Sequence, residues 1–314
     1  MNRDAHRPLR VLVLGGSGHI GARWLQMHAA TAPAAPDASP LALEAFSASR
    51  HAAAGQARTL ALDIRDAAPL RQALQGMDAV VNAVEGSTSA TAQGTARLCE
   101  AALRLRVRLV HLSTQSVYGP FEGTVHESMP LDPRLGGHGK AKCEAEMQLR
   151  EFVRAGGQAV VLRPGCVWGP GSERWVGRLG RWLRAGRLGE LGACGDGWSN
   201  LVHVDDVCQA ITRALRLPLE PGVLPAFNLA APDSPRWNRC FVDLALALGA
   251  TPVRRVSQRQ LWLDSHLASP ALQAAQHLAR CVGRDTSSWP EPMPPGLVRL
   301  WSQHIRLDSS AATT

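Results

Sequence analysis

The stretch Val11-Leu12-Val13-Leu14-Gly15-Gly16-Ser17-Gly18-His19-Ile20-Gly21 decides the fold class of this chain. Its apolar half predicts a short buried strand over residues 10–14, and three glycines at three-residue spacing, Gly15, Gly18 and Gly21, lead from this strand into a helix predicted over residues 18–29. Gly15 permits a tight turn, Gly18 lets backbone N–H groups approach a pyrophosphate, and Gly21 lets the helix pack against the strand. The helix dipole favours an anion at the same place. The stretch therefore predicts a dinucleotide site; a glycine-rich turn without a ligand is the alternative.

Strands and helices alternate after this turn, which is the pattern of a parallel sheet covered on both faces. We therefore predict an α/β fold, a Rossmann-type doubly wound parallel sheet. Residues 30–40, rich in Ala, Pro, Asp and Ser, predict a long loop. Further strands are predicted over residues 41–47, 59–62, 79–83, 108–112 and 159–162, and further helices over residues 67–75, 91–105 and 138–154.

The composition changes after Pro164, where Gly, Trp and Pro become more frequent. Here we predict a smaller C-terminal substrate lobe made of residues 166–199 and 230–314, with helices over 174–185 and 237–248. Residues 1–165 form the predicted cofactor-binding domain, and residues 200–229 return to it. In this returning part we expect residues 200–215, which include a helix from Val204, and the strand 226–229 to join the main sheet. We expect the tail, residues 307–314, to be frayed because it carries few apolar side chains.

Composition limits the class of protein further. Hydrophobic residues make up 45% of the 314 residues, which is enough for a buried core. No apolar run approaches the roughly 18 residues of a membrane helix, and the run after Arg10 is too short for a signal peptide, so we expect no membrane partner. The seven cysteines are scattered without a CxxC pair, which argues against a disulfide framework or a zinc site. We expect a cytoplasmic protein without a bound metal.

The net charge is +8, but the basic residues are spread along the chain rather than clustered. Nearly all of them are arginine, since Lys140 and Lys142 are the only lysines. We therefore expect no nucleic-acid partner.

The GxxGxxG spacing resembles that of the short-chain dehydrogenase/reductase superfamily, and later segments resemble its extended branch, the NAD(P)-dependent epimerase/dehydratase family. These segments run in order as far as about Gly249. They are Asp63-Ile64-Arg65-Asp66, Val81-Asn82-Ala83-Val84, Ser113-Thr114-Gln115-Ser116-Val117-Tyr118-Gly119, the run from Leu162 to Gly171, Asn200-Leu201-Val202-His203-Val204-Asp205-Asp206-Val207 and Phe227-Asn228-Leu229. The resemblance implies a cofactor site made of Gly15, Ser17, Gly18, His19, Ile20, Gly21, Arg50, Asp63, Ile64, Ala83, Val84, Lys142, Pro164, Cys166 and Val167.

The end of the second predicted strand bears on the choice of nucleotide. NAD enzymes place a carboxylate there for the ribose hydroxyls, whereas NADP enzymes place an arginine nearby for the 2′-phosphate. Ser49-Arg50 resembles the arrangement of NADP users, so we predict NADP, with NAD as the second candidate. Two alternatives stay open: Arg50 is an ordinary surface arginine, or Glu44 reaches the ribose in a different strand register.

Members of this family usually carry Ser or Thr, Tyr and Lys, the last two in a YxxxK arrangement. The resemblance places Thr114 and Lys142 in the first and third slots and His138 in the tyrosine slot. Tyr118 is the only tyrosine and belongs to another motif, so no shift of the alignment restores the pattern. His138 and Lys142, four residues apart, share one helix face.

A nearby lysine and the positive oxidised nicotinamide favour a neutral imidazole at His138. A neutral imidazole accepts a proton from an alcohol or donates a hydrogen bond to a carbonyl. Our first hypothesis is therefore an NADP-dependent oxidoreductase that transfers hydride between the nicotinamide and a carbonyl, an alcohol or a nucleotide sugar. Epimerisation and dehydration are variants of this reaction. The second is a non-catalytic NADP-binding sensor or partner protein that has lost the tyrosine, and the third is a protein that binds no nucleotide.

The resemblance also places several side chains near the substrate. Trp168, Trp175, Trp182 and Trp198 are equally suited to line a pocket or to fill the core of the smaller lobe. Four arginines at helical spacing suit either an anionic substrate or, as we prefer, a solvated helix face: Arg174, Arg178, Arg181 and Arg184. Family members often dimerise through two helices per subunit, here residues 91–105 and 138–154, so we expect a homodimer.

Overall fold

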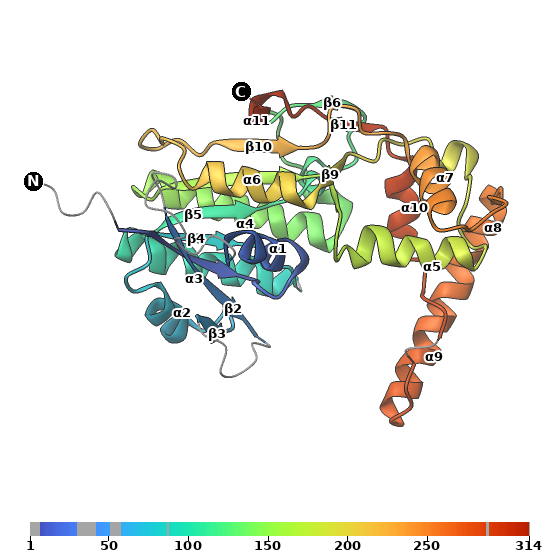
Figure 1. Cartoon of the computed structure of the whole chain (residues 1–314), viewed down its shortest axis with the longest axis horizontal. Coiled ribbons are helices and arrows are strands. Elements are labelled where there is room, and N and C mark those ends of the chain that lie inside the picture. The colour runs from blue at the N-terminus through green and yellow to red at the C-terminus, as the bar shows by residue number, and fades with distance from the viewer. Residues whose placement is uncertain (1–6, 30–41, 51–57, 87, 287–288, 314) are drawn as a thin grey trace, which may run out of the picture.

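The computed structural model of the protein describes residues 7–29, 42–50, 58–86, 88–286 and 289–313. Its centre is a seven-stranded sheet in the order β10-β7-β5-β4-β1-β2-β3, with parallel pairing throughout (Figure 1). The strand order reverses between β1 and β4, as it does in doubly wound sheets, so the predicted fold class is confirmed. The strands are β1 Leu9–Leu14, β2 Leu43–Ser49, β3 Thr59–Ala61, β4 Ala79–Asn82, β5 Arg108–Leu112, β7 Ala159–Pro164 and β10 Ala226–Leu229.

Helices cover both faces of this sheet. The helices α2 (Ala67–Leu74), α3 (Thr88–Leu105) and α4 (Gly137–Arg154) bury one face, and α1 (His19–Ala29) and α6 (Val204–Ala214) bury the other. Side chains of β1 alternate between the two cores: Leu12 and Leu14 join the first, and Val11 and Val13 join the second. This two-sided burial explains why the strand is an uninterrupted apolar run.

A third core lies at one end of the molecule (Figure 1). Its large members include Trp182, Trp237, Phe241 and Trp301, which contact one another edge-on or stacked. The residues of this core come from segments that we predicted to form the smaller lobe, whose boundaries stay a prediction. The helical segments here are η4 Glu173–Gly177, α5 Arg178–Arg184, η5 Gly192–Gly195, α7 Trp237–Ala247, α8 Gln258–Leu263, η6 Asp264–Ala268, α9 Ser269–Cys281 and α10 Pro295–Ser302.

Two small parallel sheets connect distant parts of the chain. Strand β8 (Cys166–Trp168) pairs with β9 (Leu201–His203), and β6 (Gly123–Val125) pairs with β11 (Ile305–Leu307). The remaining described elements are η2 Gln115–Tyr118, η3 Pro133–Leu135 and α11 Ser310–Thr313.

Two predictions were wrong. Residues 201–203 do not join the main sheet, because β9 pairs with β8 and only β10 extends the main sheet from this part of the chain. The tail is not frayed: Leu307 is buried in β11, the amide of Asp308 donates to the carbonyl of Val125 at 2.9 Å, and the hydroxyl of Ser309 donates to the carbonyl of Ala230 at 2.8 Å. These partners are distant in sequence, so the composition of the tail gave no sign of them.

The other predicted elements are present with shifted ends. Strand β2 begins at residue 43 and ends at 49, two residues later than predicted, and α3 begins three residues earlier, at 88. The predicted helix 174–185 is divided into the single π-helical turn η4 and α5. The predicted loop 30–40 lies outside the described residues.

Candidate functional site

A pocket of about 860 Å³ opens at the carboxyl ends of the central strands, next to the point where the strand order reverses. This volume lies in the range of small-molecule and cofactor sites. Every predicted site residue except Gly21 lines it: Gly15, Ser17, Gly18, His19, Ile20, Arg50, Asp63, Ile64, Ala83, Val84, Thr114, His138, Lys142, Pro164, Cys166 and Val167.

The glycine turn lines this pocket and has no room for a side chain at Gly15 or Gly21. Gly15 has a φ of +81°, and a Cβ there would lie 2.6 Å from the carbonyl oxygen of Ala83. A Cβ on Gly21 would lie 2.4 Å from the carbonyl oxygen of Gly15, which explains why Gly21 supports the turn without lining the pocket. A Cβ on Gly18 meets only the Gly15 carbonyl, at 3.2 Å, so this residue is glycine for a reason other than packing. The amides of Gly15 and Gly16 donate to the carbonyl of Ala48, and that of Gly18 donates to the carbonyl of Gly15, so the turn is held against the sheet. The start of α1 follows this turn at the pocket, and a helix N-terminus suits a pyrophosphate.

The first residue of α1 contacts the segment that follows β8. The ring of His19 contacts the carbonyl oxygen of Pro170 at 3.0 Å through Nε2. Partial burial lowers the pKa of His19, so its neutral form is favoured.

The end of β2 carries no carboxylate. Glu44 lies near the start of the strand, where it forms ion pairs with Arg10 at 3.3 Å and with Arg58 at 3.2 Å. The register of β2 against β1 therefore removes Glu44 from the pocket, whereas Ser49 and Arg50 line it.

Asp63 lines the same end of the pocket. Its carboxylate is held by Arg65 at 2.6 Å, and the hydrogen bonds from Arg65 lower the pKa of Asp63 to about 2. Asp63 is thus an anion at neutral pH and accepts hydrogen bonds at this end.

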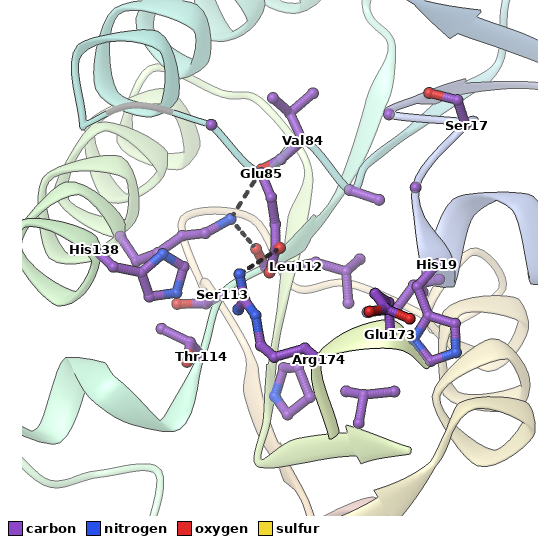
Figure 2. Close-up of a pocket in the computed structure, with 18 of the residues that line it drawn as sticks. Ser17, His19, Val84, Glu85, Leu112, Ser113, Thr114, His138, Glu173 and Arg174 are labelled. Atoms are coloured by element: carbon purple, nitrogen blue, oxygen red, sulfur yellow. Dashed lines mark hydrogen bonds and ion pairs between the residues drawn. The ribbon is translucent and has the colours of Figure 1, made fainter. Parts of the chain in front are cut away.

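The other end of the pocket gathers the predicted catalytic side chains (Figure 2). Lys142 is buried on α4, and its ammonium donates to the carbonyl of Leu112 at 2.7 Å and to that of Val84 at 3.3 Å. Burial lowers the pKa of Lys142 to about 8. The hydroxyl of Thr114 accepts a hydrogen bond from the amide of Ser116 at 3.3 Å, which fixes its position before η2.

His138 lies one helix turn before Lys142, at the surface of the same pocket (Figure 2). Desolvation and the charge of Lys142 lower the pKa of His138, so the neutral imidazole predominates. Glu85, which follows β4, opposes this shift, and Arg174 in η4 adds to it. Glu85 and Arg174 form an ion pair of 3.6 Å across the pocket, drawn as a dashed line in Figure 2.

Comparison with known proteins gives the family. The family model described as "NAD dependent epimerase/dehydratase family" matches residues 11–230. This chain belongs to that family. The resemblance expected from the sequence motifs is thereby confirmed, and the family is one of NAD-dependent oxidoreductase-type enzymes.

Two curated relatives match different shares of their own length. A dTDP-glucose 4,6-dehydratase of Mycolicibacterium smegmatis is 30% identical over 231 residues, covering 66% of this chain and 69% of the relative. Protein YeeZ of Escherichia coli is 32% identical over 161 residues, covering 51% of this chain and 53% of YeeZ, so this chain spans about half the length of that relative.

Solved structures share the fold. DesIV, a dTDP-glucose 4,6-dehydratase from Streptomyces venezuelae with NAD and TYD bound, is 27% identical, with a TM-score of 0.66 over 80% of this chain and 85% of DesIV. A UDP-glucose 4-epimerase from Thermotoga maritima is 20% identical, with a TM-score of 0.64 over 79% of this chain and 85% of that one, and this likeness concerns the fold alone.

In this epimerase/dehydratase member, the single tyrosine lies away from the pocket in a buried network. The hydroxyl of Tyr118 donates to Asn228 at 2.6 Å and accepts from Arg163 at 2.8 Å. Arg163 forms a two-point ion pair with Glu146, and the hydroxyl of Ser113 donates to Glu146 at 2.6 Å. Tyr118 therefore holds the strand β7 to its neighbours.

The tryptophans and arginines left open by the sequence are distributed among core, pocket and surface. Trp182 is buried in the third core, Trp168 is exposed, Trp198 lies under two arginine side chains, and Trp175 lines the pocket. Arg174 and Arg178 line the pocket, where Arg174 is 52% exposed and paired with Glu85 and Arg178 is paired with Glu291, so our preference for a solvated arginine face stays a prediction. Arg181 is held by Glu173 and Glu291, and Arg184 is exposed.

Sequence reasoning missed several pocket residues. Glu85 directly follows the strand-end segment that we singled out, so its position along the chain was a usable signal. Pro294, Leu297 and Leu300 also line the pocket, from α10 and the residue before it, and nothing in the local sequence placed them there.

Two absences apply to the described ranges alone. None of the helices in them is both long and apolar enough to cross a membrane. In those same ranges, no three His, Cys, Asp or Glu side chains come together as a ligand set for a metal ion.

Proposed function

We propose that this protein is an NADP-dependent oxidoreductase that transfers hydride between the nicotinamide and a carbonyl or alcohol carbon. The observation that carries the proposal is a single pocket that joins the glycine turn to Thr114, His138 and Lys142. The glycine turn suits a dinucleotide, and the three side chains suit proton transfer to or from an oxygen.

Each residue has a separate task in this reaction. The backbone amides at the start of α1 bind the pyrophosphate, and the ammonium of Lys142 binds the nicotinamide ribose. Thr114 holds the substrate oxygen by a hydrogen bond, and neutral His138 takes the hydroxyl proton during alcohol oxidation or organises a water that does so. The nicotinamide supplies hydride transfer when it is bound. Side chains around it exclude water from the reacting carbon.

The choice of NADP rests on Ser49 and Arg50 at the end of β2. A guanidinium binds a phosphate by two parallel hydrogen bonds, and in the described residues β2 ends without a carboxylate, while the nearby carboxylate of Asp63 is held by Arg65. We expect NADPH to bind more tightly than NADH, as measured by the fluorescence of the reduced coenzyme. Arg50→Ala should remove the preference for NADPH. The control Arg58→Ala should keep it, because Arg58 pairs with Glu44 near the start of β2. Equal affinities in the unaltered protein would contradict the assignment and favour NAD.

For the substrate we propose a nucleotide sugar or a related carbonyl compound. Trp175 offers a flat apolar surface, Arg174 and Arg178 offer positive charge, and Leu297 and Leu300 add apolar contacts. A nucleotide base and a diphosphate fit this combination. Two of the proteins named above, that of Mycolicibacterium smegmatis and DesIV, are dTDP-glucose 4,6-dehydratases by name, which supports the proposal.

The deciding experiment is turnover of NADP⁺ or NADPH with a panel of ketones, alcohols and nucleotide sugars. We expect activity that Lys142→Ala reduces at least about 100-fold, since the ribose contact and the charge next to His138 are both lost. Absence of turnover by the unaltered protein, or turnover indifferent to Lys142→Ala, would contradict catalysis.

A second candidate, a non-catalytic NADP-binding protein, is favoured by the histidine at position 138. The variant His138→Tyr separates the two. Loss of an existing activity assigns His138 a chemical role, whereas new activity in a previously inactive protein shows that the native chain is a binding protein. Failure to bind either reduced coenzyme would contradict both candidates.

The predicted homodimer and cytoplasmic location stay predictions. For the dimer we propose the outer surfaces of α3 and α4, where Leu103 and Met147 are exposed. Sedimentation of the unaltered protein and of Met147→Glu tests this assignment. The unaltered protein should be a dimer and the variant a monomer.

A further inference from the structure

The reacting end of the pocket contains an unusual concentration of basic groups. Lys142, His138 and Arg174 line it together, and His19 lies farther along the same wall. When His138 accepts a proton, a third positive charge forms beside Lys142 and Arg174. Such a charge is strongly disfavoured unless an anion lies close to it.

Three carboxylates line the described part of the pocket, and two of them are already engaged. Asp63 is held by Arg65 at 2.6 Å at the far end, and Glu173 is bonded to Arg181. Glu85 is held less closely than Asp63: the ion pair that it forms within the described residues, with Arg174, has a separation of 3.6 Å. This separation is longer than a hydrogen bond, and the side chains of Glu85 and Arg174 are 62% and 52% exposed.

The position of Glu85 places its carboxylate among the groups of the reacting end (Figure 2). It lies three residues after the end of β4 and one residue after Val84, whose carbonyl accepts a hydrogen bond from Lys142. Its charge acts on His138 and on Lys142, and the charge of Arg174 acts on His138 from η4 on the other side. The charged groups that face His138 are thus Lys142 from its own helix, Glu85 from the end of β4 and Arg174 from η4.

We propose that Glu85 is the electrostatic partner of His138, stabilising the imidazolium that forms during turnover, and that Arg174 limits this effect by pairing with Glu85. The proposal rests on the proposed function. In alcohol oxidation the carbinol carbon loses a hydride to the oxidised nicotinamide, its hydroxyl loses a proton to His138, and the C–O bond becomes a carbonyl. Glu85 exchanges no atom in this step and acts as a positioning residue through charge.

The test is the titration midpoint of His138, followed by NMR of its ring protons in the cofactor-free protein and assigned with His138→Asn. Glu85→Gln should lower the midpoint by about half a pH unit, a value reduced from that of a buried pair because Glu85 is exposed. Arg174→Gln should raise it, because a positive charge is removed and Glu85 is released. Glu85→Asp, which keeps the charge, should leave it close to that of the unaltered protein.

Glu173→Gln is the matched control, since it removes the other nearby pocket carboxylate and should not move the midpoint. An unchanged or raised midpoint in Glu85→Gln, or an equal shift in Glu173→Gln, would overturn the proposal. A lowered midpoint in Arg174→Gln would overturn the role of Arg174. These readouts need no turnover, so they succeed or fail independently of the proposed function.

With an active protein, the pH profile of kcat/KM for alcohol oxidation adds a second measurement. Its acidic limb follows deprotonation of His138, so Glu85→Gln should move that limb to lower pH and lower the plateau, because the base is weaker. A plateau that falls while the limb stays in place would show a merely structural role and contradict the proposal.

Discussion

Replacing Lys142 with methionine should make the folded protein more stable at neutral pH while removing its proposed activity. Lys142 is buried on α4 and donates to the carbonyls of Leu112 and Val84. Methionine has a similar length and no charge, so it fills the same space without the cost of burying an ammonium group.

The magnitude follows from the pKa of the buried amine. Burial lowers the pKa of Lys142 from 10.5 to about 8, which corresponds to a cost of roughly 3 kcal/mol when the group is charged. The variant leaves two carbonyls without their donor, which costs about 1 kcal/mol each. We therefore expect Lys142→Met to be about 1 kcal/mol more stable than the unaltered protein at pH 7.

The pH dependence gives a sharper test. Below pH 8 Lys142 is charged in both the folded and the unfolded chain, so the cost is fully present. Between about 8 and 10.5 the unfolded chain still holds a proton that the folded chain has released, so the stability of the unaltered protein rises with pH. Lys142→Met lacks this group, so its stability should not show this rise.

The assay is urea unfolding of both proteins from pH 7 to pH 10.5. The unaltered protein should gain up to about 3 kcal/mol relative to the variant over this range. The other titratable groups are common to both proteins, so their contributions cancel in the difference. Parallel curves across the whole range would refute the assignment of a lowered lysine pKa.

Other substitutions test the turn and the buried network. Gly21→Ala places a methyl group 2.4 Å from the carbonyl oxygen of Gly15 and should cost about 1–3 kcal/mol together with most of the coenzyme affinity, measured by unfolding and by fluorescence titration. Gly18→Ala meets that oxygen only at 3.2 Å, so it should lose affinity with little loss of stability; unchanged binding would contradict the phosphate assignment. Arg163→Met leaves Glu146 charged, buried and without its guanidinium partner, and should cost about 3–5 kcal/mol in urea unfolding, whereas a cost below about 1 kcal/mol would show that the pair is unimportant.

The sequence was sufficient for features that depend on neighbouring residues. The strand β1, its glycine turn and the helix α1 are written within about twenty residues, and their apolar spacing and glycine positions have local physical causes. The face shared by His138 and Lys142 follows in the same way from helix geometry. The order of the motifs along the chain also indicated the family, because several weak matches in the right order are more specific than any one of them.

Only the tertiary structure decided what distant segments do to one another. Strand β11 pairs with β6, β9 pairs with β8 rather than with the main sheet, and Glu85 pairs with Arg174. Each of these contacts joins residues that no local sequence pattern relates. The register of β2 likewise depends on its pairing with β1, and it placed Glu44 near the start of the strand, outside the pocket lining, and Arg50 just after its carboxyl end, in the lining. Periodicity fixes which side of a segment is buried, whereas the position of a charge in a pocket depends on how the whole chain closes around it.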